Sequence, residues 1–156
     1  MAKYHPFLEQ TLTNMAILRR SAQQYMESLQ MWEWLKNIQE VVYGQDSEVL
    51  IYTYKNIGIC YLALGIPEKA EDYYLKAITL MELMQQVEGS GAAPESDPEL
   101  LKEDREQLAT LYHNLFISAI SNNDREKARD YNLKTMHYYS LLHGDKSLEV
   151  SNCKQI

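Results

Sequence analysis

One pattern of small and large residues occurs three times along this chain. It is most complete in residues 51–84. Most of its positions there are three or four residues apart, as residues on one face of a helix are. Its members there are Tyr54, Ile57, Gly58, Tyr61, Gly65, Ala70, Tyr74 and Ala77. Two further copies start at residues 9 and 109. A chain built from copies of one unit stacks them to bury a continuous core, so the repeat predicts an array of helix pairs.

Gly58 indicates where the two helices of residues 51–84 approach each other closely. A glycine inside a helix costs about 1 kcal/mol relative to alanine, so its presence points to a packing requirement. Tyr61 and Tyr74 are expected to fill the space around it. Gly65 is expected to end the first helix. Pro67 then lies in the first turn of the second helix, where a missing N–H costs nothing.

The other two copies are residues 9–42 and residues 109–142. The first copy places Leu12, Met15, Ala16, Ser28, Trp32 and Leu35 at positions of the pattern. The last copy places Tyr112, Leu115, Ala119 and Ala128 there, and departs from it at Phe116, Asn132 and Thr135. Small or apolar residues are expected at those three positions. The departures predict a third helix pair that is distorted or that caps the array.

Two segments lie outside the copies. Residues 86–98 combine glycine, proline, serine and acidic residues, which predicts a solvated acidic loop. Pro98 is expected to open an extended first helix of the third pair. Residues 143–156 form a tail whose first eight residues match the connector 43–50, so a further repeat is expected to start there.

The pattern resembles the tetratricopeptide repeat, whose 34-residue unit reads W-x2-L-G-x2-Y, then A-x3-F, then A. The eight-residue connectors, together with His5-Pro6 and the stretch 11–16, resemble the 42-residue repeats of kinesin light chains. The resemblance implies an all-α fold. It implies one domain over residues 1–156, a right-handed helical solenoid of three such helix pairs with a short C-terminal extension.

The resemblance also implies a groove lined by the first helix of each pair. Position 6 of each copy is an asparagine, and related repeats use it to hold the main chain of a peptide, which a carboxamide can do by donating and accepting. Alternatively, these asparagines bond between neighbouring first helices and only stabilise the stack; the two roles are compatible. The predicted lining is Thr13, Asn14, Ile17, Arg20, Tyr52, Lys55, Asn56, Ile59, Leu62, His113, Asn114 and Ile117.

Position 9 of each copy is an isoleucine, namely Ile17, Ile59 and Ile117, and Ile120 lies on the same side. This line predicts an apolar strip suited to an amphipathic helix or a hydrophobic peptide. The alternative is that neighbouring helices bury these isoleucines.

The groove of chaperone-binding repeats holds a terminal carboxylate with Lys, Asn, Asn, Lys and Arg at set positions. Only Asn56 fits here, because the remaining positions are Thr13, Ile17, Thr110 and Asn114. The sequence therefore predicts no clamp of that kind.

Composition excludes several other functions. The net charge of −7 disfavours nucleic acid and anionic membranes as partners. No stretch reaches the roughly 18 apolar residues of a membrane span. Cys60 and Cys153 lack the spacing of a zinc site or redox pair. No nucleophile elbow, P-loop, dinucleotide motif or zinc-protease motif occurs. We predict no enzyme activity, no catalytic residue, no cofactor and no metal, and a cytoplasmic location.

These observations predict a scaffold or adaptor that binds a peptide or helix of another protein. One alternative is a structural subunit that stacks end-on into a larger complex, or self-associates through its C-terminal end. Another is a regulatory or sensor domain. The resemblance to kinesin light chains extends the expected location to cytoskeletal or ciliary assemblies by analogy alone.

Overall fold

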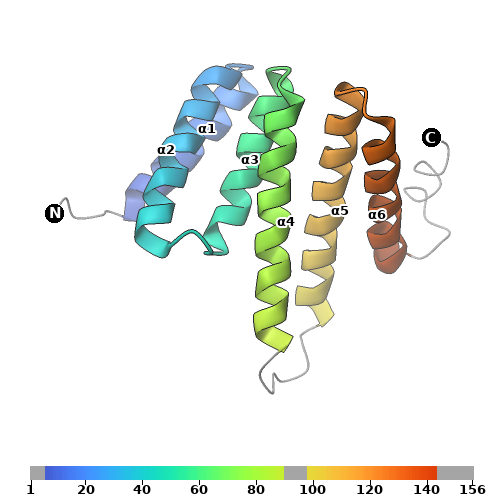
Figure 1. Ribbon diagram of the computed structural model, residues 1–156. Coiled ribbons are helices and arrows are strands. Elements are labelled where there is room, and N and C mark those ends of the chain that lie inside the picture. Colours follow the sequence, from blue (N-terminus) through green and yellow to red (C-terminus); the bar gives the residue numbers. More distant parts are fainter. Residues whose placement is uncertain (1–5, 90–97, 144–156) are drawn as a thin grey trace. The chain divides into compact units, whose positions relative to one another are not determined.

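The computed structural model describes residues 6–89 and 98–143, which form six α-helices with no strand among them (Figure 1). The helices are α1 (Pro6–Ser21), α2 (Tyr25–Tyr43), α3 (Val49–Ala63), α4 (Pro67–Gly89), α5 (Pro98–Ser121) and α6 (Arg125–His143). The fold class is the predicted all-α helical repeat. The chain divides into two compact units, Met1–Ala77 and Ile78–Ile156.

Three helix pairs are closed by the same short turn. At its centre stand Gln23, Gly65 and Asn123, which occupy position 15 of their copies and have φ values of 61°, 75° and 57°. In each turn this residue donates its backbone N–H to a carbonyl three residues earlier, and the next residue donates to one five residues earlier. This is the bonding of a left-handed helix cap. The prediction that Gly65 ends a helix is confirmed, and two non-glycine residues make the same turn.

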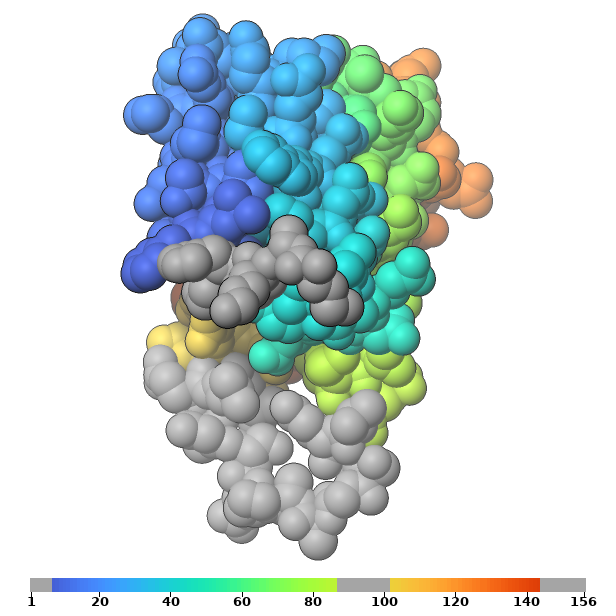
Figure 2. All heavy atoms as spheres, turned by 90° about the vertical axis from the view of Figure 1, so that its left-hand side faces the viewer, coloured from blue at the N-terminus to red at the C-terminus, as the bar shows by residue number. Residues whose placement is uncertain are grey.

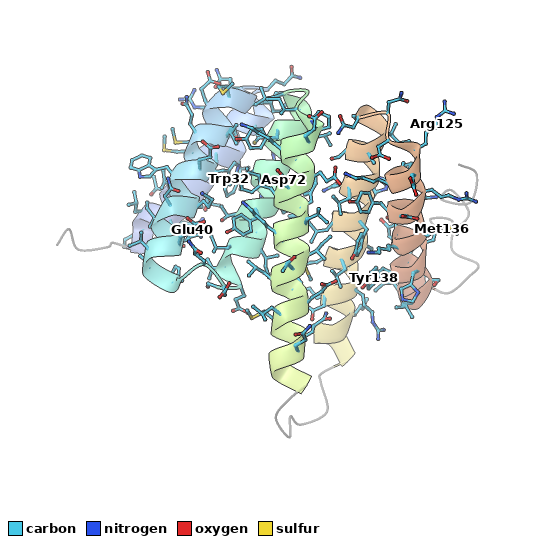
Figure 3. All side chains as sticks on the ribbon, in the orientation of Figure 1. Trp32, Glu40, Asp72, Arg125, Met136 and Tyr138 are labelled. Atoms are coloured by element: carbon cyan, nitrogen blue, oxygen red, sulfur yellow. The ribbon has the colours of Figure 1, made fainter. Side chains whose placement is uncertain are left out.

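Helices α1, α2 and α3 pack in succession, each antiparallel to the one before. Ser28 Oγ on α2 donates to the carbonyl oxygen of Ala16 at 2.7 Å. Between α3 and α2, the Tyr61 hydroxyl donates to Glu33 Oε1 at 2.9 Å. Trp32 on α2 is fully buried, as its place in the pattern predicts (Figure 3). Because both neighbours run antiparallel to α2, helices α1 and α3 run in the same direction.

Gly58 of α3 lies against the ring of Tyr74 on α4. A Cβ atom built on Gly58 would lie 2.5 Å from Cε1 of that ring. Both Tyr74 and Ala77 are fully buried. The close approach predicted from Gly58 is confirmed, and α4 begins at Pro67 as expected.

Helices α5 and α6 form a packed pair despite the departures from the pattern. The rings of Tyr112 and Tyr138 stack with centroids 5.6 Å apart, and Leu115 and Ala119 are fully buried. Thr135 is also fully buried, and its hydroxyl donates to the carbonyl oxygen of Tyr131 at 2.9 Å. A threonine that satisfies its own hydroxyl within the helix fits an apolar position.

The predicted loop 86–98 differs at its start, because α4 continues through Gln86 to Gly89. Its other end is as expected, with α5 opening at Pro98. Residues 90–97 and 144–156, and with them nearly all of the predicted tail, lie outside the described residues. The single-domain organisation and the extra repeat in the tail stay predictions. None of the described helices is long and apolar enough to cross a membrane.

Candidate functional site

Nine of the twelve predicted groove residues lie on α1 and α3, within the unit Met1–Ala77. Those on α1 are Thr13, Asn14, Ile17 and Arg20, and those on α3 are Tyr52, Lys55, Asn56, Ile59 and Leu62. The other three, His113, Asn114 and Ile117, lie on α5.

Asn56 joins the two first helices of this unit. Its side chain is buried, with 1% of its surface exposed. The carboxamide oxygen accepts a hydrogen bond from Arg20 Nη1 at 2.7 Å, and the carboxamide nitrogen donates to the carbonyl oxygen of Tyr52 at 2.8 Å. Asn56 therefore performs the stacking role that the sequence left open beside peptide binding.

The other two asparagines at position 6 have different surroundings. Asn14 is exposed, and its carboxamide oxygen accepts a hydrogen bond from Gln10 Nε2 at 2.9 Å within α1. Asn114 is half-buried on α5. The repeated residue thus does not have one repeated role, since only Asn56 has a bonding partner on another first helix among the described residues.

Arg20 and Lys55 place two positive charges beside Asn56. Lys55 Nζ lies 5.2 Å from the centroid of the Tyr52 ring. Burial lowers the pKa of Lys55, and the nearby charge of Arg20 lowers it further. Among the described residues, no carboxylate forms a salt bridge with either cation. The face shared by α1 and α3 is therefore locally cationic in a chain of net charge −7.

Apolar side chains flank these cations without being sealed from solvent. Ile17, Ile59 and Leu62 are all half-buried. Tyr52 is 46% exposed, and its ring meets that of Trp32 edge to face, with centroids 5.7 Å apart. The isoleucine strip on this unit is thus partly covered by neighbouring helices and partly open.

The three residues on α5 also present surface. His113 is exposed, with its ring centroid 6.1 Å from that of Phe116, and Ile117 is 36% exposed. Ile120, on the same helix, is exposed as well. Participation of these residues in a groove stays a prediction.

A buried polar chain across α1, α2 and α3 was not predicted. Thr53 Oγ1 donates to Gln39 Oε1 at 2.6 Å, and Gln39 Nε2 donates to Glu9 Oε2 at 3.3 Å. Thr53 and Gln39 are both buried. A threonine and a glutamine at helix positions that otherwise face the core were the available signal. These hydrogen bonds fix the register of α1, α2 and α3 beneath the candidate face.

A second unpredicted cluster lies where α2, α3 and α4 meet. The Tyr73 ring stands 5.7 Å from both Tyr54 and Tyr61, and Lys76 Nζ lies 4.7 Å from the Tyr73 centroid. The Tyr54 hydroxyl donates to Glu40 Oε1 at 3.3 Å (Glu40 is labelled in Figure 3). Burial, followed by the adjacent carboxylate, raises the pKa of Tyr54 to about 12. These contacts hold three helices together.

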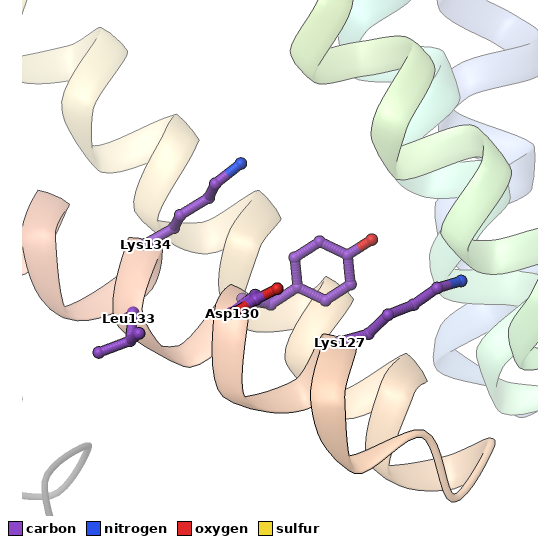
Figure 4. Close-up of a pocket in the computed structure, with 5 residues that line it drawn as sticks. Lys127, Asp130, Leu133 and Lys134 are labelled. Atoms are coloured by element: carbon purple, nitrogen blue, oxygen red, sulfur yellow. The ribbon is translucent and has the colours of Figure 1, made fainter.

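A shallow pocket of about 370 Å³ lies on α6 (Figure 4). It is lined by Lys127, Asp130, Tyr131, Leu133 and Lys134. All five residues come from a single helix, and none belongs to the predicted groove. Within the described ranges, no group of three or more His, Cys, Asp or Glu side chains is placed to hold a metal ion.

Residues 7–82 match the family model described as tetratricopeptide repeat, which covers α1, α2, α3 and most of α4. No curated protein matches the chain.

Proposed function

We propose that this chain is a scaffold or adaptor, because residues 7–82 match the tetratricopeptide repeat, a unit that generally mediates protein–protein interaction. It holds a peptide or helix of a partner protein on the face that α1 and α3 share. The residues that contact the partner are Thr13, Ile17, Arg20, Tyr52, Lys55, Ile59 and Leu62. The role of Asn56 there is indirect, because its carboxamide already bonds to Arg20 and to the Tyr52 carbonyl.

The half-buried strip of Ile17 and Ile59 carries this proposal. Apolar side chains on facing first helices, open enough to touch a ligand and set among polar groups, are what a peptide-binding groove requires. The bridge from Arg20 to Asn56 holds the two helices in register. The strip is therefore preformed, which reduces the entropy lost on binding.

The test is selection of a random peptide library, displayed on phage, against the full-length chain. We expect one family of related peptides to be enriched. Ile59→Glu is expected to weaken binding of these peptides at least about tenfold, because it places a charge among the apolar contacts. The matched control is Ile38→Glu, which changes a half-buried isoleucine on α2 instead of on a first helix.

Fluorescence anisotropy with a labelled, selected peptide measures both variants, and circular dichroism verifies that each is folded. Equal affinity of Ile59→Glu and wild type would remove the proposed groove. So would the absence of any peptide enriched above a selection without the chain.

End-on association is a second candidate, and the exposed apolar residues of α1 and α2 favour it. Leu18 is 69% exposed, Trp34 53% and Val41 87%. Figure 2 shows the side of the molecule that α1 and α2 form. Exposed apolar surface on the terminal helices of a repeat array favours end-on association. If this function holds, sedimentation velocity should show dimers at micromolar concentration that Val41→Ser together with Leu18→Ser abolishes.

Three finer assignments accompany the adaptor proposal. The eight-residue connectors support repeats of the kinesin light chain type. By analogy with that type, we place the protein in the cytoplasm, in cytoskeletal or ciliary assemblies. Control of a separate effector, as in a regulatory or sensor domain, would use the same face.

A further inference from the structure

The candidate face carries two cations that lack a carboxylate partner among the described residues, Arg20 of α1 and Lys55 of α3. We propose that these two side chains together bind the carboxylate of an aspartate or glutamate side chain within the partner's segment. This inference rests on the proposed function and adds to it the chemistry of the ligand.

The Arg20 side chain is fixed in position by a hydrogen bond to Asn56. The Asn56 carboxamide oxygen accepts one of its N–H groups at 2.7 Å, and Asn56 is itself buried and fixed by its bond to the Tyr52 carbonyl. A guanidinium has five N–H donors in a planar fork. Those that remain can reach a carboxylate, and charged hydrogen bonds of this kind are about twice as strong as neutral ones.

Lys55 supplies a second positive charge, close enough to Arg20 for the two charges to repel each other. Its ammonium group lies 5.2 Å from the centroid of the Tyr52 ring, and the side chain is half-buried. Burial and the repulsion from Arg20 both lower its pKa. An anion between the two cations would replace this repulsion with attraction to both.

The positions of the isoleucines favour an internal acidic residue over a chain terminus. The hydrogen bond places the guanidinium of Arg20 beside the Asn56 carboxamide. Ile17 lies three residues before Arg20 on α1, and Ile59 lies three residues after Asn56 on α3, each about one helical turn away along its own helix. A segment crossing the face therefore meets half-buried apolar side chains close to the cations.

This site differs from the carboxylate clamp that the sequence excludes. The clamp positions hold Thr13, Ile17, Thr110 and Asn114. Asn56 is the single match to the clamp, and its carboxamide oxygen accepts a hydrogen bond from Arg20 instead of contacting a ligand. The acidic group is held by cations at other positions of the repeats.

The experiment uses one selected peptide, acetylated and amidated so that its carboxylates are side chains only, and two counterparts in which glutamine or lysine replaces the acidic residue. With wild type we expect the glutamine peptide to bind at least about tenfold more weakly. Lys55→Glu should lose the acidic peptide and gain affinity for the lysine peptide. The control is Lys69→Glu on α4, whose ammonium lies 5.3 Å from the Tyr61 ring and which should bind as wild type does.

Equal affinity of wild type for the acidic and glutamine peptides would overturn the proposal. Equal losses in Lys55→Glu and Lys69→Glu would overturn it too, since the effect would then follow net charge alone. Selected peptides that carry no acidic residue, or that bind only with a free C-terminus or a phosphoserine, would also count against it. Each of these results leaves the groove itself standing, whereas the groove fails when Ile59→Glu binds as wild type does.

Discussion

The helix pairs α3–α4 and α5–α6 fill the same two positions of the repeat in opposite ways. Position 8 is Gly58 in α3 and Phe116 in α5, while position 24 is Tyr74 in α4 and Asn132 in α6. The first pair puts its large residue on the second helix, and the other pair puts it on the first. Both pairs are packed. A helix pair of this kind therefore packs without a small residue at position 8 and a large one at position 24.

The largest expected difference between the two pairs is at position 24. Tyr74→Ala removes a fully buried ring and leaves a cavity beside Gly58, so we expect it to lower the free energy of unfolding by about 4 kcal/mol. Asn132 is half-buried, and Asn132→Ala should lower it by less than about 1 kcal/mol. Urea denaturation measures both. Similar losses would mean that the two pairs depend equally on position 24.

Position 8 gives the next effect. Gly58→Ala places a Cβ atom 2.5 Å from Cε1 of the buried Tyr74 ring. Overpacking of this kind costs up to about 3 kcal/mol and the gain in helix propensity returns about 1, so we expect a net loss of about 2 kcal/mol. Tyr74→Leu in the same chain should restore part of it, as a double-mutant cycle would show. A stabilised Gly58→Ala would contradict the close approach.

Much of the fold was predictable because the pairing depends on local spacing. Within one copy of the repeat, the close contact is indicated by Gly58 and Tyr74, and the helix end by Gly65 and Pro67. The packing of α5 against α6 with Phe116 and Asn132 at these positions was not predictable, because the pattern lists preferred residues only. The extension of α4 to Gly89 was missed as well, since glycine, serine and acidic residues there indicated a loop.

The asparagines at position 6 extend the comparison from the core to the candidate face. Asn56→Ala removes the acceptor of Arg20 and the contact between α1 and α3. We expect a loss of about 1.5 kcal/mol, because a hydrogen bond to a charged group is broken. Asn114→Ala should change the free energy of unfolding by less than about 0.5 kcal/mol. Asn114 is half-buried, and among the described residues it has no hydrogen-bond partner on another first helix. Equal losses from the two variants, measured in urea, would mean that the bond to Arg20 contributes little.

The candidate site was predictable as a set of positions and not as a set of roles. A recurring asparagine marks one face of each first helix, but the partner of Asn56 is Arg20, 36 positions earlier in the chain. Nothing in the sequence around either residue indicates that the two form a hydrogen bond. The same holds for the chain from Thr53 through Gln39 to Glu9, whose members come from three helices.

Tyrosines at positions 4 and 11 distinguish the pairs at alkaline pH. Burial and a carboxylate partner raise the pKa of Tyr54 and of Tyr61 to about 12, above the ordinary value of 10. The folded state therefore retains protons that the unfolded state loses, so stability present below pH 10 falls between pH 10 and 12, by up to about 1 kcal/mol per pH unit for each phenol. Tyr54→Phe with Tyr61→Phe should flatten this fall in urea titrations at pH 8 to 11.

Tyr112 is the matched comparison on α5. Burial and the charge of Glu82 raise its pKa, but its hydroxyl has no hydrogen bond to a carboxylate among the described residues. Tyr112→Phe should therefore flatten the alkaline fall less than the double variant does. A larger effect from Tyr112→Phe would show that burial, and not the carboxylate partners, separates the two pairs.

The smallest expected effect comes from position 15, where the pairs make the same turn with Gly65 and with Asn123. Both residues have positive φ, 75° and 57°. Asparagine tolerates this conformation better than other side chains, and glycine adopts it freely. Asn123→Gly should therefore raise the free energy of unfolding by about 0.5 kcal/mol, Gly65→Asn should lower it by a similar amount, and Gly65→Ala should cost about 1 kcal/mol. If Asn123→Gly is destabilising in urea, the asparagine side chain itself stabilises its turn, and the two turns are alike only in their backbone.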